Sequence, residues 1–429
     1  MKLVQLKKKN LEKRLNGLRR ETTLSAPRIE ASVRKIVESV RKKGDEALFW
    51  YTKKYDKFEI ARRTVRVSKE EVEKAKSQVS DEIKSNLALA SKRIREYQEK
   101  KLPQGKTFTD SMGNELGWVI RPIERVGIYV PGGKAAYPST VLMTAIPARV
   151  AGVEEITLVT PCPNGEINPT VVVAASMAGV DSIYKVGGAQ AVAALAYGTK
   201  SIAKVDKIVG PGNIYVTIAK KLVFGAVDID MIAGPSEVLI ISDGSSPAKW
   251  VAADLLAQAE HDEMAVPVLV TNSLEFAKKV KKEVVNRLKG LDRKEIAKEA
   301  VRNQGKIFVV DSIDDAVSVA NAFAPEHLEL CVENPKSILP KIKHAGAIFM
   351  GFTSTEAFGD YVAGPSHVLP TGGAARFSSP LSVYDFLRMP SLISISESGF
   401  RELRQSVINL AHSEGLEAHA LSVKARLDE

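Results

Sequence analysis

The side chains best suited to chemistry are concentrated in the second half of this 429-residue chain. All six histidines follow residue 260, and several have an acidic or amide neighbour close by. These pairs are Gln258 with His261, Glu326 with His327, Asp360 with His367, and Glu414 with His419. Imidazole, carboxylate and carboxamide groups are what a metal of the zinc class and a general base require. The pattern predicts a catalytic site built by the C-terminal half.

Gln258 and His261 fall at the end of an expected helix over residues 247–260. Residues three apart project from one helical face, so both side chains can bind one ion. Asp360 and His419 would complete a ligand set of nitrogen and oxygen atoms, unlike the thiolate set of a structural zinc. The alternative interpretation is a polar helix end exposed to water.

Two further motifs carry polar groups at breaks in regular structure. Glu326 and His327 follow a proline and offer a general base with a second group that activates water. The stretch 359–373 holds four glycines and two prolines, a composition that fixes an irregular backbone and positions functional groups. A solvated loop pair and a surface turn are the respective alternatives.

Glycine-rich turns in the first half predict a nucleotide site. The fingerprint GxGxxG is absent from the sequence. Three other turns place glycines just before an expected helix, where backbone N–H groups favour an anion. They are Pro131-Gly132-Gly133, Gly187-Gly188-Ala189-Gln190 and Gly210-Pro211-Gly212-Asn213. Because all three follow expected strands, they indicate a crevice at the carboxyl edge of a sheet.

Strand and helix patterns alternate from about residue 119, which predicts α/β architecture with parallel sheets. The alternation forms two blocks, 119–235 and 236 to about 380. Expected strands cover 126–130, 156–160, 183–186, 207–209, 237–242, 266–271, 306–310, 328–332 and 347–350. Residues 1–100 and the tail from 380 onward read as helical, and Ser68 with Glu71 forms a capping-box signal.

Composition narrows the class of protein. Hydrophobic residues make up 45% and charged residues 26%, as in an ordinary globular chain. No apolar run is long enough for a membrane span, and the start lacks a secretory apolar core. Cys162 and Cys331 read as free buried thiols of a reducing cytosol. A net charge of +10 without interleaved aromatics argues against nucleic-acid binding.

Taken together, these motifs closely resemble the histidinol dehydrogenase family. The matching segments run in family order from about residue 119 to the C-terminus. They are Tyr129–Gly133, Lys185–Gln190, Gly210–Asn213, Ala233–Glu237, Gln258–His261, Ala324–Leu328, Gly359–Gly373 and Glu414–His419. The resemblance implies two Rossmann-like doubly wound α/β domains with helical N-terminal and C-terminal extensions. It also implies a cytoplasmic homodimer that oxidises L-histidinol to L-histidine, with two NAD+ reduced.

The resemblance also implies a role for each site residue. Glu326 would activate water and His327 would be the base. Gln258, His261, Asp360 and His419 would bind Zn2+, for which Mn2+ could substitute. The same four residues, with Ser236, His327, His367 and Glu414, would contact the substrate, and Tyr129, Gln190 and Asn213 would contact NAD.

The implied domain plan has four parts. Residues 1–25 would form a helical arm, and 26–128 with 236–380 would form a discontinuous catalytic domain. Residues 129–235 would be an inserted NAD-binding domain, and 381–429 a helical segment that completes the partner's site. Two other functions fit part of the sequence: a zinc hydrolase without nucleotide, and a non-catalytic α/β binding protein. NAD binding would distinguish the first, and loss of turnover in a His327→Asn variant the second.

Overall fold

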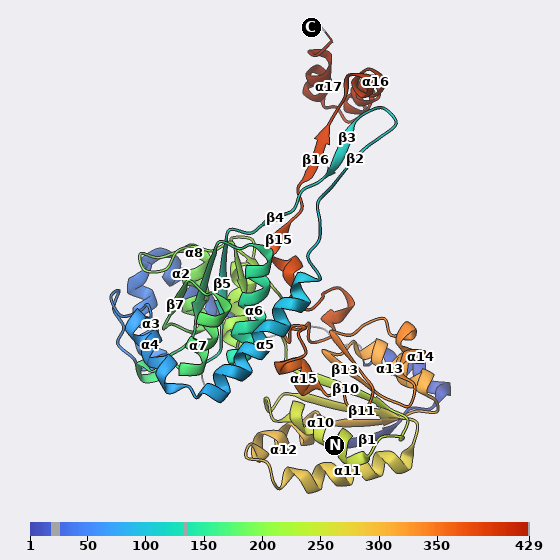
Figure 1. Ribbon diagram of the computed structural model, residues 1–429. Coiled ribbons are helices and arrows are strands. Elements are labelled where there is room, and N and C mark those ends of the chain that lie inside the picture. The colour runs from blue at the N-terminus through green and yellow to red at the C-terminus, as the bar shows by residue number, and fades with distance from the viewer. Residues whose placement is uncertain (19–25, 133–135, 428–429) are drawn as a thin grey trace.

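The computed structural model describes residues 1–18, 26–132 and 136–427, and its chain forms two α/β lobes and a projecting arm (Figure 1). The first lobe is built around a five-stranded parallel sheet in the order β7-β6-β5-β8-β9. Its strands are β5 (Arg125–Tyr129), β6 (Glu155–Val159), β7 (Ser182–Tyr184), β8 (Lys207–Val209) and β9 (Asp228–Ile229). Near-continuous apolar runs form these strands because both faces of the sheet are covered.

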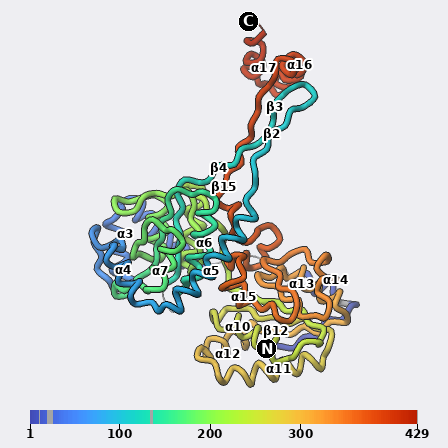
Figure 2. The backbone as a smooth tube through the Cα atoms, viewed as in Figure 1, coloured from blue at the N-terminus to red at the C-terminus, as the bar shows by residue number. Residues whose placement is uncertain are grey.

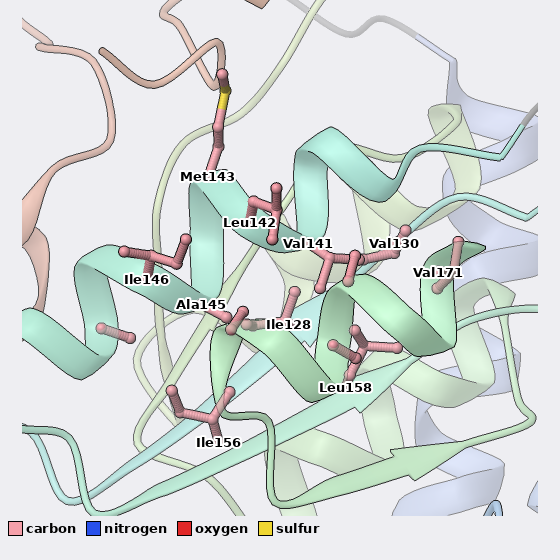
Figure 3. Packing of buried hydrophobic residues seen from close by; sticks show 14 of the residues in the cluster. Ile128, Val130, Val141, Leu142, Met143, Ala145, Ile146, Ile156, Leu158 and Val171 are labelled. Carbon is pink, nitrogen blue, oxygen red and sulfur yellow. The ribbon is translucent and has the colours of Figure 1, made fainter. Parts of the chain in front are cut away.

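Helices cover both faces of the first sheet. One face packs against α4 (Lys69–Gln78), α5 (Asp81–Glu99), α6 (Pro138–Ala151) and α7 (Pro169–Ala178). The other packs against α2 (Pro27–Lys43), α3 (Asp45–Asp56), α8 (Gly188–Tyr197) and α9 (Ile214–Val223). Figure 3 shows the first of these contacts, with Ile128 and Ile156 from neighbouring strands meeting Ala145 of α6. Full burial of such a side chain stabilises the fold by about 1.5–3 kcal/mol.

The second lobe surrounds a six-stranded parallel sheet in the order β1-β12-β11-β10-β13-β14. Its strands are β1 (Lys2–Gln5), β10 (Glu237–Ser242), β11 (Val266–Thr271), β12 (Lys306–Val309), β13 (His327–Cys331) and β14 (Ala347–Met350). Helices α10 (Ala248–Ala259), α11 (Leu274–Leu288) and α12 (Lys294–Asn303) cover one face. Helices α1 (Leu11–Asn16), α13 (Ile313–Phe323) and α14 (Pro335–Ile338) lie on the other, and α15 (Glu356–Tyr361) follows β14.

An arm extends away from both lobes (Figures 1 and 2). It consists of the antiparallel sheet β16-β3-β2, formed by β2 (Lys106–Thr109), β3 (Glu115–Trp118) and β16 (Ser391–Ser394). The pair β4 (Arg121–Pro122) and β15 (Leu387–Arg388) lies at its base. Helices α16 (Glu397–Ser413) and α17 (Glu417–Lys424) cap its far end.

The structure confirms the parallel α/β class and corrects the assignment of the first 128 residues. Residues 26–99 supply helices of the first lobe, because Val33 and Ile36 of α2 lie in one core with α8 and α9. They also contact the segment after α15, where Arg93 donates to the backbone oxygen of Val362. The expected helical arm over 1–25 begins instead with β1, which pairs in parallel with β12. Part of that arm, 19–25, and Gly133 of the first glycine turn lie outside the described residues.

The tail is also less helical than expected. β15 and β16 precede its two helices, and β16 pairs antiparallel with β3. The capping box of Ser68 and Glu71 is present as predicted, with both reciprocal hydrogen bonds at the start of α4. Among the described residues, no helix combines the length and the apolar character that a membrane crossing requires.

Candidate active site between the two lobes

The predicted catalytic residues gather at the amino edge of the second sheet. β13 starts at His327, and β10 starts next to it at Glu237. Helix α10 runs back from the far end of β10 and therefore brings Gln258 and His261 to the same edge. α15 does the same for Asp360. Because strand residues alternate in direction, His327 points to the α10 side while Leu328 packs into the opposite core.

His327 has the properties of a general base. Its ring is buried, and Nδ1 lies 2.9 Å from the backbone oxygen of Glu237. A carbonyl oxygen only accepts, so we assign the ring proton to Nδ1. Nε2 then carries the lone pair; it has no hydrogen-bond partner among the described residues and lies 3.9 Å from Asp360 Oδ1. Burial lowers the pKa of His327 to about 3, which keeps the imidazole neutral.

Glu326 lies beside this base. Its Oε2 accepts a hydrogen bond of 2.8 Å from the backbone N–H of Glu237 and lies 3.7 Å from His327 Nδ1. Burial, and then the charges of Glu237 and Asp360, raise the pKa of Glu326 well above its usual range. A carboxyl in this position, once ionised, can accept a proton from a water molecule next to His327.

Three of the four predicted metal ligands converge. A nitrogen of His261 and carboxylate oxygens of Glu356 and Asp360 lie within 4.8 Å of one another. The amide of Gln258 lies 3.5 Å from His261 Nδ1. Gln258, His261 and Asp360 offer nitrogen and oxygen donors, which fit a divalent ion such as zinc or manganese, and the Glu356 carboxylate lies beside them. Burial raises the pKa of Asp360 to about 7, and a bound cation would favour its ionised form.

His367 joins the two lobes at this site. Its Nδ1 lies 3.1 Å from the backbone oxygen of Asp360, and its Nε2 lies 3.1 Å from the hydroxyl of Thr140. Thr140 is in the first turn of α6, which follows β5 of the first lobe. Ser236 immediately precedes β10, and its backbone oxygen accepts from Val266. The carboxyl edge of the first sheet therefore faces the amino edge of the second.

Two predicted residues lie elsewhere in this chain. Glu414 follows α16, and His419 lies on α17, both exposed at the far end of the arm (Figure 1). The structure does not bring them to the other ligands of the same chain.

The three predicted NAD contacts lie at the carboxyl edge of the first sheet. Tyr129 ends β5; its hydroxyl accepts from Gly188 at 3.0 Å, and burial raises its pKa to about 12. Gln190 is buried in the first turn of α8. Asn213 begins α9, and its Oδ1 accepts from the N–H groups of Tyr215 and Val216. All three lie where helix N-termini can bind a phosphate group.

Sequence reasoning missed three residues that surround this cluster: Glu329, Glu356 and Thr140. Glu356 precedes Asp360 by four, the spacing of one helical face, and this signal was available in the sequence. Glu329 also had a signal, because a carboxylate inside the buried strand His327–Cys331 needs a partner. Thr140 had none, since only the tertiary structure places it against His367.

The two α/β lobes meet edge to edge. The first offers turns suited to a nucleotide, and the second offers a base beside candidate metal ligands. This arrangement is that of a dehydrogenase-like enzyme. Comparisons identify the family. The model of the family "Histidinol dehydrogenase" matches residues 19–427. The chain is 51% identical to histidinol dehydrogenase of Bacillus thuringiensis subsp. konkukian, over 96% of each protein. It is also 51% identical to that of Aquifex aeolicus, over the full length of both.

A solved structure agrees. The crystal structure of histidinol dehydrogenase from Elizabethkingia anophelis has a TM-score of 0.94 and 38% sequence identity, and the match covers 100% of this chain and 98% of that one. This chain belongs to the histidinol dehydrogenase family, whose members are NAD-dependent oxidoreductases of histidine biosynthesis.

Proposed function

We propose that this protein oxidises L-histidinol to L-histidine through L-histidinaldehyde, the final step of histidine biosynthesis, with two NAD+ reduced. The observation that supports this most directly is the state of His327. Its Nε2 is neutral and buried, and no described residue hydrogen-bonds to it. A base in that state can accept a proton from the substrate twice in one reaction cycle.

In the first oxidation, His327 is the only side chain that transfers a proton. Nε2 takes the hydroxyl proton of histidinol while a hydride leaves the same carbon, which gives the aldehyde. When bound, NAD+ would accept the hydrides, and a metal ion would hold the substrate through its imidazole and amine nitrogens. Anchoring the substrate away from the reacting carbon keeps that carbon in place while the cofactor is exchanged.

The second oxidation needs water as well. Glu326 removes a proton from the water that adds to the aldehyde carbon, so that a gem-diol forms. His327 then takes a hydroxyl proton as the second hydride leaves, and the product ionises to the carboxylate. The whole reaction consumes one water and two NAD+ and releases two NADH and three protons. The short path from Glu326 to His327 lets both groups act on one carbon.

The ligands proposed for one Zn2+ per subunit are Gln258, His261 and Asp360 of one chain and His419 of its partner. Mn2+ is a plausible substitute, because a nitrogen and oxygen donor set accepts both ions. Ser236 and His367 would contact the substrate in the same chain, and Glu414 would contact it from the partner. Tyr129, Gln190 and Asn213 would contact NAD.

In a homodimer with shared sites, the arm would contact the partner subunit and contribute residues to the partner's active site. The arm exposes large apolar side chains that the described chain does not cover, including Ile393 at 69% and Leu410 at 64% exposure. A groove of about 900 Å³ between α16 and the end of α17 combines apolar side chains such as Phe400 and Val407 with three arginines. A second copy that covered these surfaces would bring His419 and Glu414 to the neighbouring site. We place the enzyme in the cytoplasm, since Cys162 and Cys331 are free thiols.

The test is the number of NADH formed per histidinol consumed, before and after treatment with a chelator. We expect two NADH, loss of turnover on chelation, and recovery with zinc. One NADH would contradict the second oxidation and the role of Glu326. No NADH from folded, zinc-loaded protein would favour a hydrolase.

A further inference from the structure

A pair of buried glutamates lies directly behind the proposed metal ligands and has no part in the proposed reaction. Glu356 is the first residue of α15 and is 2% exposed. Glu329 is on β13, two residues after His327, and is fully buried. Burying a carboxyl group costs free energy unless the group makes specific contacts. The contacts of Glu329 and Glu356 therefore indicate the role of the pair.

Glu356 determines which end of the Gln258 amide faces the metal position. One end lies 2.9 and 3.0 Å from the two carboxylate oxygens of Glu356 and 3.2 Å from the backbone oxygen of Glu237. These three oxygens are acceptors, and the fourth neighbour, His327 Nδ1 at 3.2 Å, directs its proton to the backbone oxygen of Glu237, so we assign this end as the NH2 group. The amide oxygen then takes the position 3.5 Å from His261 Nδ1. An oxygen and a ring nitrogen that face each other in this way both present lone pairs to a cation.

Glu329 holds the helix that carries Glu356. Its Oε1 accepts a hydrogen bond of 2.8 Å from the backbone N–H of Glu356, at the start of α15. Asp360 lies one turn further along the same short helix. Glu329 also lies beside Asp254, which precedes Gln258 by four residues on α10, with carboxylate oxygens of the two residues within 4.8 Å of each other. The contacts therefore link β13, α10 and α15, the three elements around the proposed metal position.

We propose that Glu356 is a positioning residue that fixes the amide of Gln258 with its oxygen toward the metal, and that Glu329 anchors the turn carrying Glu356 and Asp360. This inference rests on the metal site of the proposed function. An acceptor-only carboxylate is required, because a glutamine at position 356 could donate to the amide oxygen and stabilise the reversed orientation. Partners that orient metal ligands typically contribute a factor of about 10–100 in metal affinity.

The test compares zinc affinity in the full-length wild type, Glu356→Gln, Glu356→Asp and a control, Glu295→Gln. The control removes an exposed carboxylate that pairs with Lys298 in the same lobe. Competition with a chromophoric chelator should show zinc binding about 10–100-fold weaker in Glu356→Gln. Glu356→Asp keeps an acceptor-only group and should bind zinc more tightly than Glu356→Gln. The control should match the wild type.

Cobalt absorption separates positioning from direct ligation. At saturating Co2+, the bound ion itself selects the amide orientation that turns the Gln258 oxygen toward it, so the visible bands of Glu356→Gln should match those of the wild type. Changed bands would overturn the proposal, because the variant would then have a different ligand set even when the metal position is filled. Zinc affinity within twofold of the wild type in Glu356→Gln would also overturn it. A wild type that binds no zinc would instead remove the proposed metal site, and the inference with it.

Discussion

The two lobes share one architecture but offer opposite edges of their sheets to the site. The first lobe presents its carboxyl edge, where helices begin and glycine turns expose backbone N–H groups. The second presents its amino edge, where β13 begins at His327 and α10 ends next to Gln258. Helix N-termini favour anions and helix C-termini favour cations. The same fold can therefore provide a place for a pyrophosphate and a place for a metal ion.

The two sheet edges also differ in whether their polar side chains already have hydrogen-bond partners within the protein. At the carboxyl edge, Tyr129 and Asn213 already make hydrogen bonds within the turns, so they shape the backbone. At the amino edge, His327 Nε2 has no hydrogen-bond partner among the described residues, and Gln258 is oriented by its neighbours. We therefore expect cofactor binding to depend mainly on the first lobe, and the chemistry, with its metal and substrate, on the second. The following predictions test that division.

The largest effect is expected at the amino edge. His327→Asn should lower kcat about 10³-fold, because general-base catalysis contributes about 10²–10⁴ and asparagine cannot accept the proton. NAD affinity, measured by titration of cofactor fluorescence, should stay within threefold of the wild type. His344→Asn, at a histidine without a proposed role, is the control. A His327→Asn variant with normal turnover would remove the proposed base.

The next largest effect is expected on the stability of the first lobe, where a buried ion pair supports a turn at the carboxyl edge of the sheet. Lys220 and Asp230 form a buried ion pair that holds the backbone N–H and oxygen of Gly210. Lys220→Met leaves the Asp230 charge unpaired and should cost about 3 kcal/mol of unfolding free energy in urea. The exposed pair of Lys298 and Glu295 provides the control, since Lys298→Met should cost less than about 1 kcal/mol. Equal costs would mean that the buried pair contributes no special stability.

The pH dependence of stability should change with Asp56. This residue ends α3, its Oδ2 has no hydrogen-bond partner among the described residues, and burial raises its pKa to about 6. The ordinary pKa of 3.8 applies when the chain is unfolded, so the group favours folding below pH 4 and this benefit is lost as pH rises through 6.

Asp56→Asn should therefore become more stable than the wild type as pH rises from about 4 to 7. We expect a gain of about 1–2 kcal/mol after allowance for the partial exposure of the carboxyl. Urea unfolding at several pH values measures this gain, and the exposed Asp292→Asn should show none. A gain that is largest at low pH would contradict the assignment.

The smallest effect separates cofactor binding from stability. Asn213→Ala removes the cap of α9 and should cost about 1 kcal/mol. Ser273→Ala removes the equivalent cap of α11 in the second lobe, at a similar cost. Steady-state kinetics should show a higher KM for NAD only in Asn213→Ala, with kcat nearly unchanged. A similar change in both variants would mean that the two edges do not divide binding from chemistry.

Much of the fold could be predicted because buried parallel strands leave a strong local pattern. Strands 207–209, 237–242, 266–271 and 347–350 begin and end at the predicted residues. β1 could not be predicted, since four residues with a mixed pattern become a strand only by pairing with β12. The resemblance implied a domain plan that joined residues 26–128 to the second lobe, whereas α2 packs with α8 and α9 of the first, a long-range contact that no local pattern records.

The site divides in the same way. Local spacing was enough to connect Gln258 with His261, because three residues on a helix fix a shared face. The meeting of Asp360 with His327 depends on how α15 lies over β13, and no local pattern records it. The resemblance to a family supplied that set of residues. It could not supply Glu329 and Glu356, whose role became apparent only through the orientation of one amide.

The place of β1 in the second sheet has a consequence for how the chain reaches its native state. Lys7 and Asp311 pair beside this strand although they are 304 residues apart in sequence. β1 must therefore remain unpaired until the first lobe and the strands β10, β11 and β12 of the second have been made. Contacts over such distances slow folding, since a long loop must close before they form. β1 can therefore join the second sheet only after β12 has been made, while β13 and β14 are added later.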